Sequence, residues 1–115
     1  EYLRESISED IAVDDFRGLL RHLSTLHPMK FRYLLRDLKG IVLTDVQKLV
    51  SQVDALRMVS FIDRAYEQQI PIRATGEVAL TDVFTEEMVS GGYKKKYLRC
   101  VSRASALSSA TFPAS

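Results

Sequence analysis

The chain has 115 residues, of which 46% are hydrophobic and 27% are charged, a balance typical of a soluble globular domain. Sixteen Lys and Arg against fifteen Asp and Glu give a net charge of +1, so binding to nucleic acid would need a local basic patch. No apolar run approaches the ~20 residues of a membrane-spanning helix, and the single cysteine, Cys100, excludes an internal disulfide.

The first third of the chain predicts a loose segment and two amphipathic helices. Residues 1–13 are acidic and polar with isolated apolar side chains, and we expect them to be loosely ordered. One helix should begin at Asp14 and end at His27, and a second should begin at Pro28 and end before Gly40. Apolar residues recur at the helical period in both, at Phe16, Leu19, Leu20, Leu23 and Leu26 and then at Phe31, Leu34, Leu35 and Leu38.

The middle of the chain predicts a strand, a helix and a second strand over residues 40–46, 51–69 and 70–75. Such a βαβ unit indicates an α/β fold with a short parallel sheet. Apolar residues occur on more than one side of the helix, so we expect it to be covered on two sides. A short parallel sheet would leave strand edges exposed, which favours a homo-oligomer.

After Gly76 a short helical turn should start near Thr81, and the pair Gly91 and Gly92 should end it. A basic helix is predicted over residues 93–107, with apolar and cationic residues on different faces. Residues 108–115 should form a flexible tail. The sequence thus divides into a loose segment at 1–13, one α/β domain at 14–107 and a tail at 108–115.

Few side chains are candidates for catalysis. Asp45 ends an apolar strand, as the magnesium-binding acid does in nucleotide hydrolases, but valine follows it where a water-orienting Glu would stand. The chain has no Gly-x-x-x-x-Gly-Lys-Ser/Thr loop, so Asp45 and the strand-ending Thr75 are interpreted as structural. His22 and His27 are poorly spaced for a metal, and Cys100 lies in an amphipathic helix. We therefore predict no catalytic residue and no metal site in this chain.

Residues 94–103 contain five basic residues and form the strongest local signal. They could be a solvated face, bind a phosphate backbone, or present arginines to a nucleotide held by a neighbouring domain or subunit. Arg99 and Arg103 lie four residues apart, so one helix face could bring both to the same anion. The three preceding lysines are interpreted as solubilising charge.

Residues 56–66 and 99–103 together resemble the C-terminal part of the ZapE/AFG-like ATPases. In that family an Arg and an apolar stretch ending in Ile-Asp precede a Tyr, and a later helix carries Arg-x-x-Ser-Arg-Leu. Ala104 occupies the position where that leucine is usual. The sequence of residues 91–99 is similar to that of actinobacterial members. The matching residues are Arg57, Asp63, Tyr66, Arg99, Ser102 and Arg103.

The resemblance implies a P-loop ATPase of the AAA-like type that uses ATP and magnesium in the bacterial cytoplasm, near the cell-division machinery. Its phosphate-binding loop would lie upstream of Glu1, so this chain would be a C-terminal fragment that holds no cofactor itself. Arg99 and Arg103 would sense the γ-phosphate, in cis or in a neighbouring subunit. The expected partners are the upstream ATPase domain, further copies of the protein and cell-division proteins.

Two other functions stay open from the residues alone. The first is a stand-alone binding module that uses the basic helix over residues 93–104 for an acidic protein or, less favoured by the overall charge, nucleic acid. The second is a small α/β enzyme, for which the sequence offers no catalytic constellation.

Overall fold

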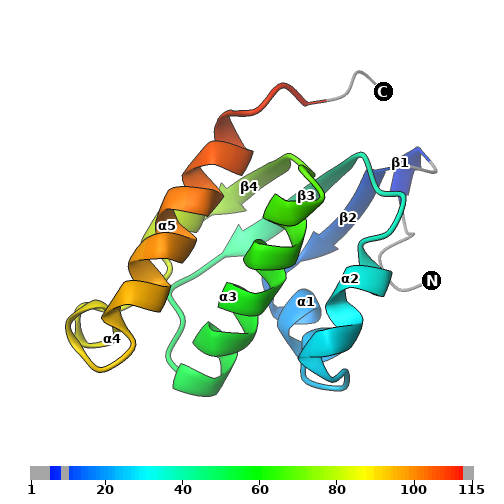
Figure 1. Ribbon diagram of the computed structural model, residues 1–115. Coiled ribbons are helices and arrows are strands. Elements are labelled where there is room, and N and C mark those ends of the chain that lie inside the picture. The colour runs from blue at the N-terminus through cyan, green and yellow to red at the C-terminus, as the bar shows by residue number, and fades with distance from the viewer. Residues whose placement is uncertain (1–5, 9–10, 113–115) are drawn as a thin grey trace.

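The computed structural model describes residues 6–8 and 11–112, which form a four-stranded sheet with helices on one face (Figure 1). The strands lie in the order β1-β2-β3-β4. Strand β1 runs antiparallel to β2, whereas β2, β3 and β4 are parallel to one another. The predicted α/β fold with a parallel sheet is therefore confirmed, and one more parallel strand joins it than the sequence predicts. The strands span Ser6–Ser8, Ile11–Asp15, Gly40–Val46 and Ile72–Gly76.

The additional strands correct the expectation of a loose segment before Asp14. Strand β2 pairs with β3 from Ile11 opposite Gly40 to Asp15 opposite Thr44. Ile11 and Ala12 are buried, so this segment is ordered by pairing with a strand almost thirty residues away, which no local pattern reveals. Residues 1–5 and 9–10 lie outside the described part of the chain, and the prediction for them stays untested.

Both N-terminal helices are shorter in the structure than the sequence predicts, and the first ends at Leu23 and not at His27. Helix α1 spans Phe16–Leu23, and Asp15 caps its N-terminus with a carboxylate that accepts a hydrogen bond of 2.7 Å from the Gly18 amide. The second region is shorter than predicted, with a 3₁₀ turn η2 at Pro28–Lys30 followed by helix α2 at Phe31–Leu34. Asp37, with a φ of 67°, takes the left-handed conformation, which a helix cannot continue through.

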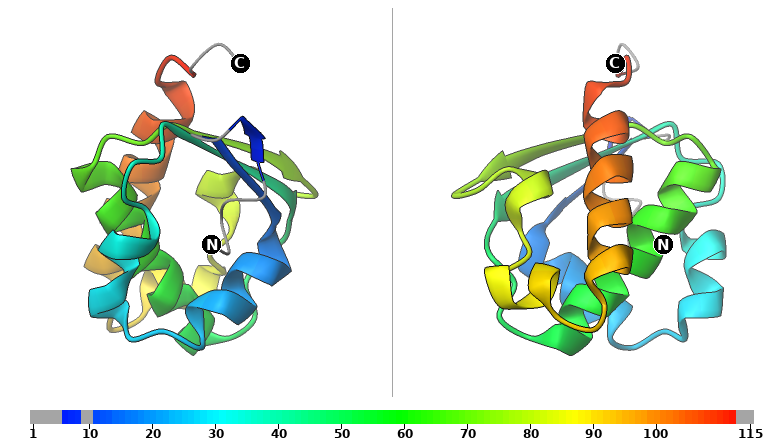
Figure 2. Two further views of the ribbon diagram at one scale, coloured as in Figure 1. Left: turned by 90° about the vertical axis from the view of Figure 1, so that its right-hand side faces the viewer. Right: turned by 60° about the vertical axis from the view of Figure 1, so that its left-hand side comes forward.

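Helix α3 spans Gln52–Glu67 and lies between α1 and α2 on one side and α5, spanning Lys94–Ser109, on the other (Figures 1 and 2). The predicted cover on two sides of this helix is confirmed. Buried residues line it on several faces, among them Met58, Val59, Phe61 and Ile62. A 3₁₀ turn η3 at Leu80–Asp82 and a short helix α4 at Glu86–Ser90 connect β4 to α5, and α4 ends at Gly91 as predicted.

The carboxyl ends of β3 and β4 meet in a bulge. Asp45 has a φ of 57°, and the pairing register shifts between Leu43 and Val46. Gly76 has a φ of 155°, and a Cβ on it would lie 2.1 Å from the Val46 backbone nitrogen. Only glycine fits here, because a side chain would collide with backbone that cannot move aside.

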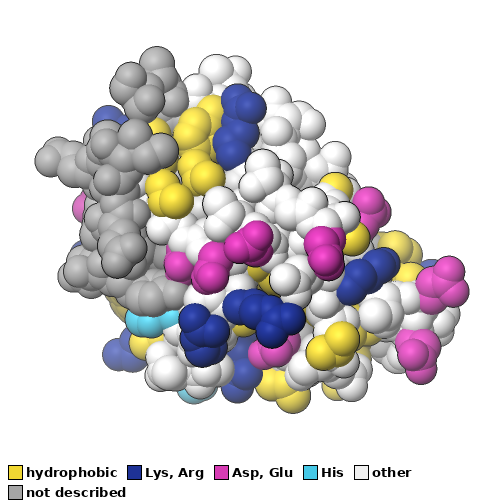
Figure 3. All heavy atoms as spheres, turned by 180° about the vertical axis from the view of Figure 1, so that it is seen from behind, with side chains coloured by type: hydrophobic (Ala, Val, Ile, Leu, Met, Phe, Trp, Pro, Cys, Tyr) yellow, Lys and Arg dark blue, Asp and Glu magenta, His cyan; other side chains and the backbone are white. Residues whose placement is uncertain are grey.

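The sheet face turned away from the helices is seen in Figure 3, where hydrophobic and charged side chains both reach the surface. Phe112 covers part of it, because a Cβ on Gly40 would come within 2.7 Å of the Phe112 ring. The Arg73 guanidinium lies 5.3 Å from the same ring centroid. These contacts correct the predicted flexible tail at 108–115: α5 continues to Ser109 and Phe112 packs on the sheet. Residues 113–115 lie outside the described part.

Over residues 6–8 and 11–112, no helix combines the length and apolar character that crossing a membrane requires.

Candidate functional site

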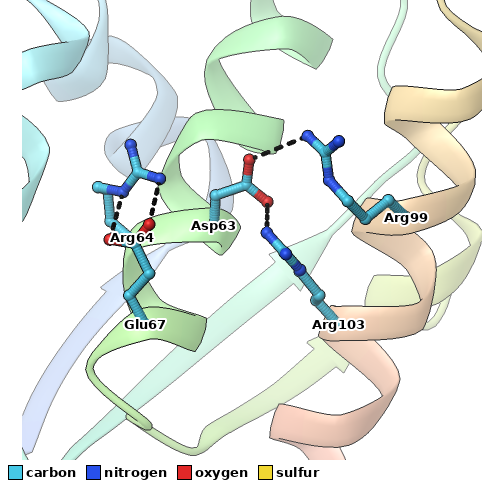
Figure 4. Close-up of polar contacts among 5 residues, drawn as sticks. All are labelled: Asp63, Arg64, Glu67, Arg99 and Arg103. Atoms are coloured by element: carbon cyan, nitrogen blue, oxygen red, sulfur yellow. Dashed lines mark hydrogen bonds and ion pairs between the residues drawn. The ribbon is translucent and has the colours of Figure 1, made fainter.

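Asp63 is the only buried charged residue in the described part of the chain, and it lies on the side of α3 that faces α5. Arg103 Nη1 donates a hydrogen bond of 2.8 Å to Asp63 Oδ1, and Arg99 Nη2 donates one of 3.3 Å to Oδ2 (Figure 4). Each carboxylate oxygen thus binds a different guanidinium. Because two cations share one acid, this group of three residues carries a formal charge of +1.

Helix geometry brings the two arginines to this carboxylate. Arg99 and Arg103 are four residues apart on α5, so both side chains project from one face of that helix. The side chain of Asp63 is 12% exposed, whereas those of Arg103 and Arg99 are 31% and 47% exposed. The acid is therefore enclosed between the helices while the guanidinium groups extend toward solvent. Water screens such a pair less than it screens a fully exposed one.

Tyr66 completes the group. The Arg103 guanidinium lies 4.9 Å from the centroid of the Tyr66 ring, one helical turn beyond Asp63 on α3. This contact is a cation–π interaction on a ring that stays partly exposed. We refer to Asp63, Tyr66, Arg99 and Arg103 as the arginine cluster. It unites four of the six residues that the family resemblance singles out.

The other two motif residues lie elsewhere. Arg57 forms an ion pair of 3.5 Å with Asp54 near the beginning of α3. Ser102 is exposed on α5, and no contact of its hydroxyl with the arginine cluster is seen in the described residues. A neighbouring pair, Arg64 with Glu67 at 2.6 Å, extends from α3 away from α5 (Figure 4). Arg57 and Ser102 are therefore not part of the cluster.

Cys100 lies between the two arginines on α5 and is buried. Burial, followed by the charge of Asp63, raises the pKa of the Cys100 thiol to about 12, although Arg99 and Arg103 act in the opposite direction. The thiol is therefore protonated at neutral pH, which disfavours a role as nucleophile.

The basic residues of α5 separate into two groups. Lys94, Lys95 and Lys96 are exposed at the start of the helix, where Lys96 Nζ lies 5.5 Å from the Tyr93 ring. The arginines instead contact α3. The segment 94–103 is thus not one continuous cationic face, although its linear sequence suggests one.

The residues weighed as phosphate or metal ligands do not converge. Asp45 and Thr75 are exposed at the carboxyl ends of β3 and β4. His27 is engaged locally, because its Nδ1 accepts a hydrogen bond from the Met29 amide. Within residues 6–8 and 11–112, no group of three or more His, Cys, Asp or Glu could hold a metal ion.

The sequence did not indicate that Asp63 would hold both arginines, since 36 and 40 residues separate the partners. One signal was available: Asp63 is an acid on an otherwise apolar side of a long helix, between Ile62 and Ala65. A charge at such a position needs a partner, because an unpaired buried carboxylate is costly. On the last helix, Arg99 and Arg103 are four residues apart, so one helix face can bring both to such an acid.

Comparison with known families gives one match. The family model described as AFG1-like ATPase matches residues 3–114, which include the whole sheet and the arginine cluster. No curated protein and no solved structure was found to match the chain.

Proposed function

The chain belongs to the AFG1-like ATPase family, and we propose that it is the C-terminal part of an ATPase whose P-loop domain precedes it. The 115 residues contain no Gly-x-x-x-x-Gly-Lys-Ser/Thr loop, the segment whose backbone amides hold the phosphates in P-loop ATPases. ATP and magnesium would therefore bind to the upstream domain. In this proposal the chain supports ATP hydrolysis without performing the chemistry.

We further propose that the arginine cluster responds to the nucleotide. The observation that carries this is the uncompensated charge, because one carboxylate binds two guanidinium groups that remain partly exposed. A guanidinium offers paired donors that match phosphate oxygens. The longer contact and greater exposure of Arg99 favour it as the side chain that leaves Asp63 for a phosphate, while Arg103 stays anchored between Asp63 and Tyr66.

The test uses the full-length protein with Arg99→Ala, Arg103→Ala and the matched control Lys95→Ala, which removes an exposed cation from the same helix. Loss of a donor that stabilises developing phosphate charge lowers kcat by about 10²-fold. We expect such a loss in the arginine variants and none in the control, measured as phosphate release at saturating ATP. Melting curves of each variant would identify losses that come from unfolding. Unchanged turnover in both folded arginine variants would overturn the proposed role of the cluster.

Mixing experiments distinguish action in cis from action in trans. A full-length variant with an inactivated P-loop would be combined with Arg99→Ala. If Arg99 reaches a neighbouring subunit, the mixture regains turnover that neither variant has alone. If it acts within its own chain, the mixture stays inactive.

The cellular role is a finer proposal that rests on the resemblance of residues 56–66 and 99–103 to ZapE-like members. We propose a bacterial cytoplasmic ATPase, of actinobacterial type, that acts on cell-division proteins. A fluorescent fusion should then collect at the division site, and deletion should lengthen the cells. A diffuse fusion with normal cell length would contradict this role. Salt-sensitive binding of the isolated chain to single-stranded DNA would instead favour the binding-module alternative.

A further inference from the structure

A second surface, independent of the arginine cluster, lies on η2 and α2. We call it the α2 surface and define it by His27, Met29, Lys30, Arg32 and Tyr33, which line a hollow of about 430 Å³. Met29 is 69% exposed and Tyr33 is 57% exposed. Pockets that hold small ligands or peptide side chains have volumes of roughly 300–1,000 Å³, so the hollow is large enough to accept one.

The surface is preformed. Phe31 and Leu35 point into the core, while Met29, Arg32 and Tyr33 fall at i, i+3 and i+4 on the opposite side. Hydrogen bonds hold the backbone of this segment in two places. The Lys30 amide donates to the His27 carbonyl at 2.8 Å, and Nε2 of Gln68, the residue that follows α3, donates to the Arg32 carbonyl at 3.1 Å. A partner would therefore not have to order this segment on binding, which reduces the entropic cost of association.

The α2 surface is cationic. It carries Lys30 and Arg32 and no acid, although the whole chain has a net charge of only +1. No carboxylate in the described part pairs with Lys30 or Arg32. The Arg36 guanidinium lies 5.1 Å from the Tyr33 ring centroid and helps to hold that ring in place.

We propose that the α2 surface binds an acidic peptide segment of a protein partner, with an apolar side chain of that segment between Met29 and Tyr33 and its carboxylates on Lys30 and Arg32. The flexible thioether of Met29 adapts to an apolar side chain, and Tyr33 supplies a large contact area. The two cations flank that contact, and a peptide of opposite charge is complementary to them.

Two other classes of partner fit less well. Nucleic acid gains affinity from many successive phosphate contacts, whereas the α2 surface offers only two cations, Lys30 and Arg32. A membrane surface calls for a protruding apolar face, but Met29 and Tyr33 are only two side chains and they line a hollow. The α2 surface lies on the opposite side of α3 from α5 (Figure 1), so it shares no residue with the arginine cluster.

The test is fluorescence anisotropy with a labelled peptide in which glutamates flank a central Leu-Phe pair. Two control peptides replace the glutamates with glutamine or the Leu-Phe pair with serines. We expect the first peptide alone to bind the purified chain, with affinity falling as salt is raised. The charge reversal Lys30→Glu/Arg32→Glu and the truncation Met29→Ala/Tyr33→Ala should each weaken binding by about tenfold or more. Lys95→Glu, which reverses an exposed charge on α5, should leave it unchanged.

The proposal fails if the acidic peptide does not bind, or if all three variants lose affinity equally, because the attraction would then be non-specific. It also fails if an oligothymidine strand or vesicles of phosphatidylcholine and phosphatidylglycerol bind the α2 surface more tightly than the peptide. The substituted side chains are all exposed, so the variants should fold. Melting curves would verify this for each variant.

Discussion

Replacing Asp63 with asparagine tests whether the arginine cluster holds α3 against α5. Asp63→Asn keeps the size and one carbonyl oxygen, but it removes the charge that accepts from Arg103 at 2.8 Å and from Arg99 at 3.3 Å. Its amide group donates hydrogen bonds, so one guanidinium would face another donor. The variant therefore leaves two like charges next to each other at the helix interface.

The expected cost lies between two known limits. Removing one partner of a buried ion pair costs roughly 3–5 kcal/mol, whereas exposed pairs contribute about 0–1 kcal/mol. Asp63 is enclosed, but both guanidinium groups are open enough to turn into water, which lowers the penalty. We expect a loss of about 2 kcal/mol in the free energy of unfolding. With a urea m-value of about 1–3 kcal/mol per molar, the midpoint falls by about 1 M.

The assay is urea unfolding of the 115-residue chain, followed by circular dichroism. Glu67→Gln is the matched control, because it breaks the more exposed Arg64 pair on the same helix and should cost less than about 1 kcal/mol. A double-mutant cycle with Arg103→Ala would isolate the coupling between the two side chains. The reasoning is refuted if Asp63→Asn is within about 0.5 kcal/mol of the wild type, or no more damaging than the control.

Further predictions concern single positions. Gly76→Ala should cost more than about 3 kcal/mol or prevent folding, because its Cβ would meet the Val46 backbone, whereas Gly92→Ala, with nothing within 4 Å, should be nearly neutral; equal melting temperatures would contradict this. Ser51→Ala should lower stability by about 1 kcal/mol, since its hydroxyl caps α3, and an unchanged urea midpoint would show that the cap contributes nothing. Cys100 has a folded-state pKa raised from 9.0 to about 12, so its contribution to stability is intact below pH 9 and is lost above it. Between pH 8 and 10 the wild type should lose about 1.4 kcal/mol more than Cys100→Ala, and parallel pH profiles would disprove the shift.

The sequence predicts the central βαβ unit well because two independent signals agree there. An apolar run with turn residues at its ends marks β3, and a long amphipathic stretch that begins at Ser51 marks α3. It fails at β2, where Asp14 and Asp15 read as helix-starting residues. Asp15 does cap α1, but the residues before it pair with β3. One short segment thus ends a strand and begins a helix, and local pattern shows only the second role.

The sequence indicates which residues of α3 and α5 to compare with the family motif, but not how they meet. Family-motif residues on α3 and α5 can be identified from the printed sequence, yet their meeting depends on how the two helices pack. The apolar stripe of α5 settles that packing: Tyr97, Cys100 and Ala104 face the core. Arg99 and Arg103 are then directed to the flank of α3 that carries Asp63. The three lysines have no such constraint, because they precede the first buried residue of the helix.

Stability and turnover have to be measured together to assign the cluster a role. If Arg99 and Arg103 only hold α5 on α3, each variant should lower turnover in the full-length enzyme in proportion to its unfolded fraction, and cooling should restore activity. If the arginines also respond to bound nucleotide, the activity of Asp63→Asn should differ from that of the arginine variants. Asp63→Asn frees both guanidinium groups from the carboxylate but leaves the two arginines in the protein. Turnover should therefore change even at temperatures where the variant is fully folded. Arg99→Ala removes the side chain with the longer contact to Asp63, and should therefore lower turnover while costing little stability.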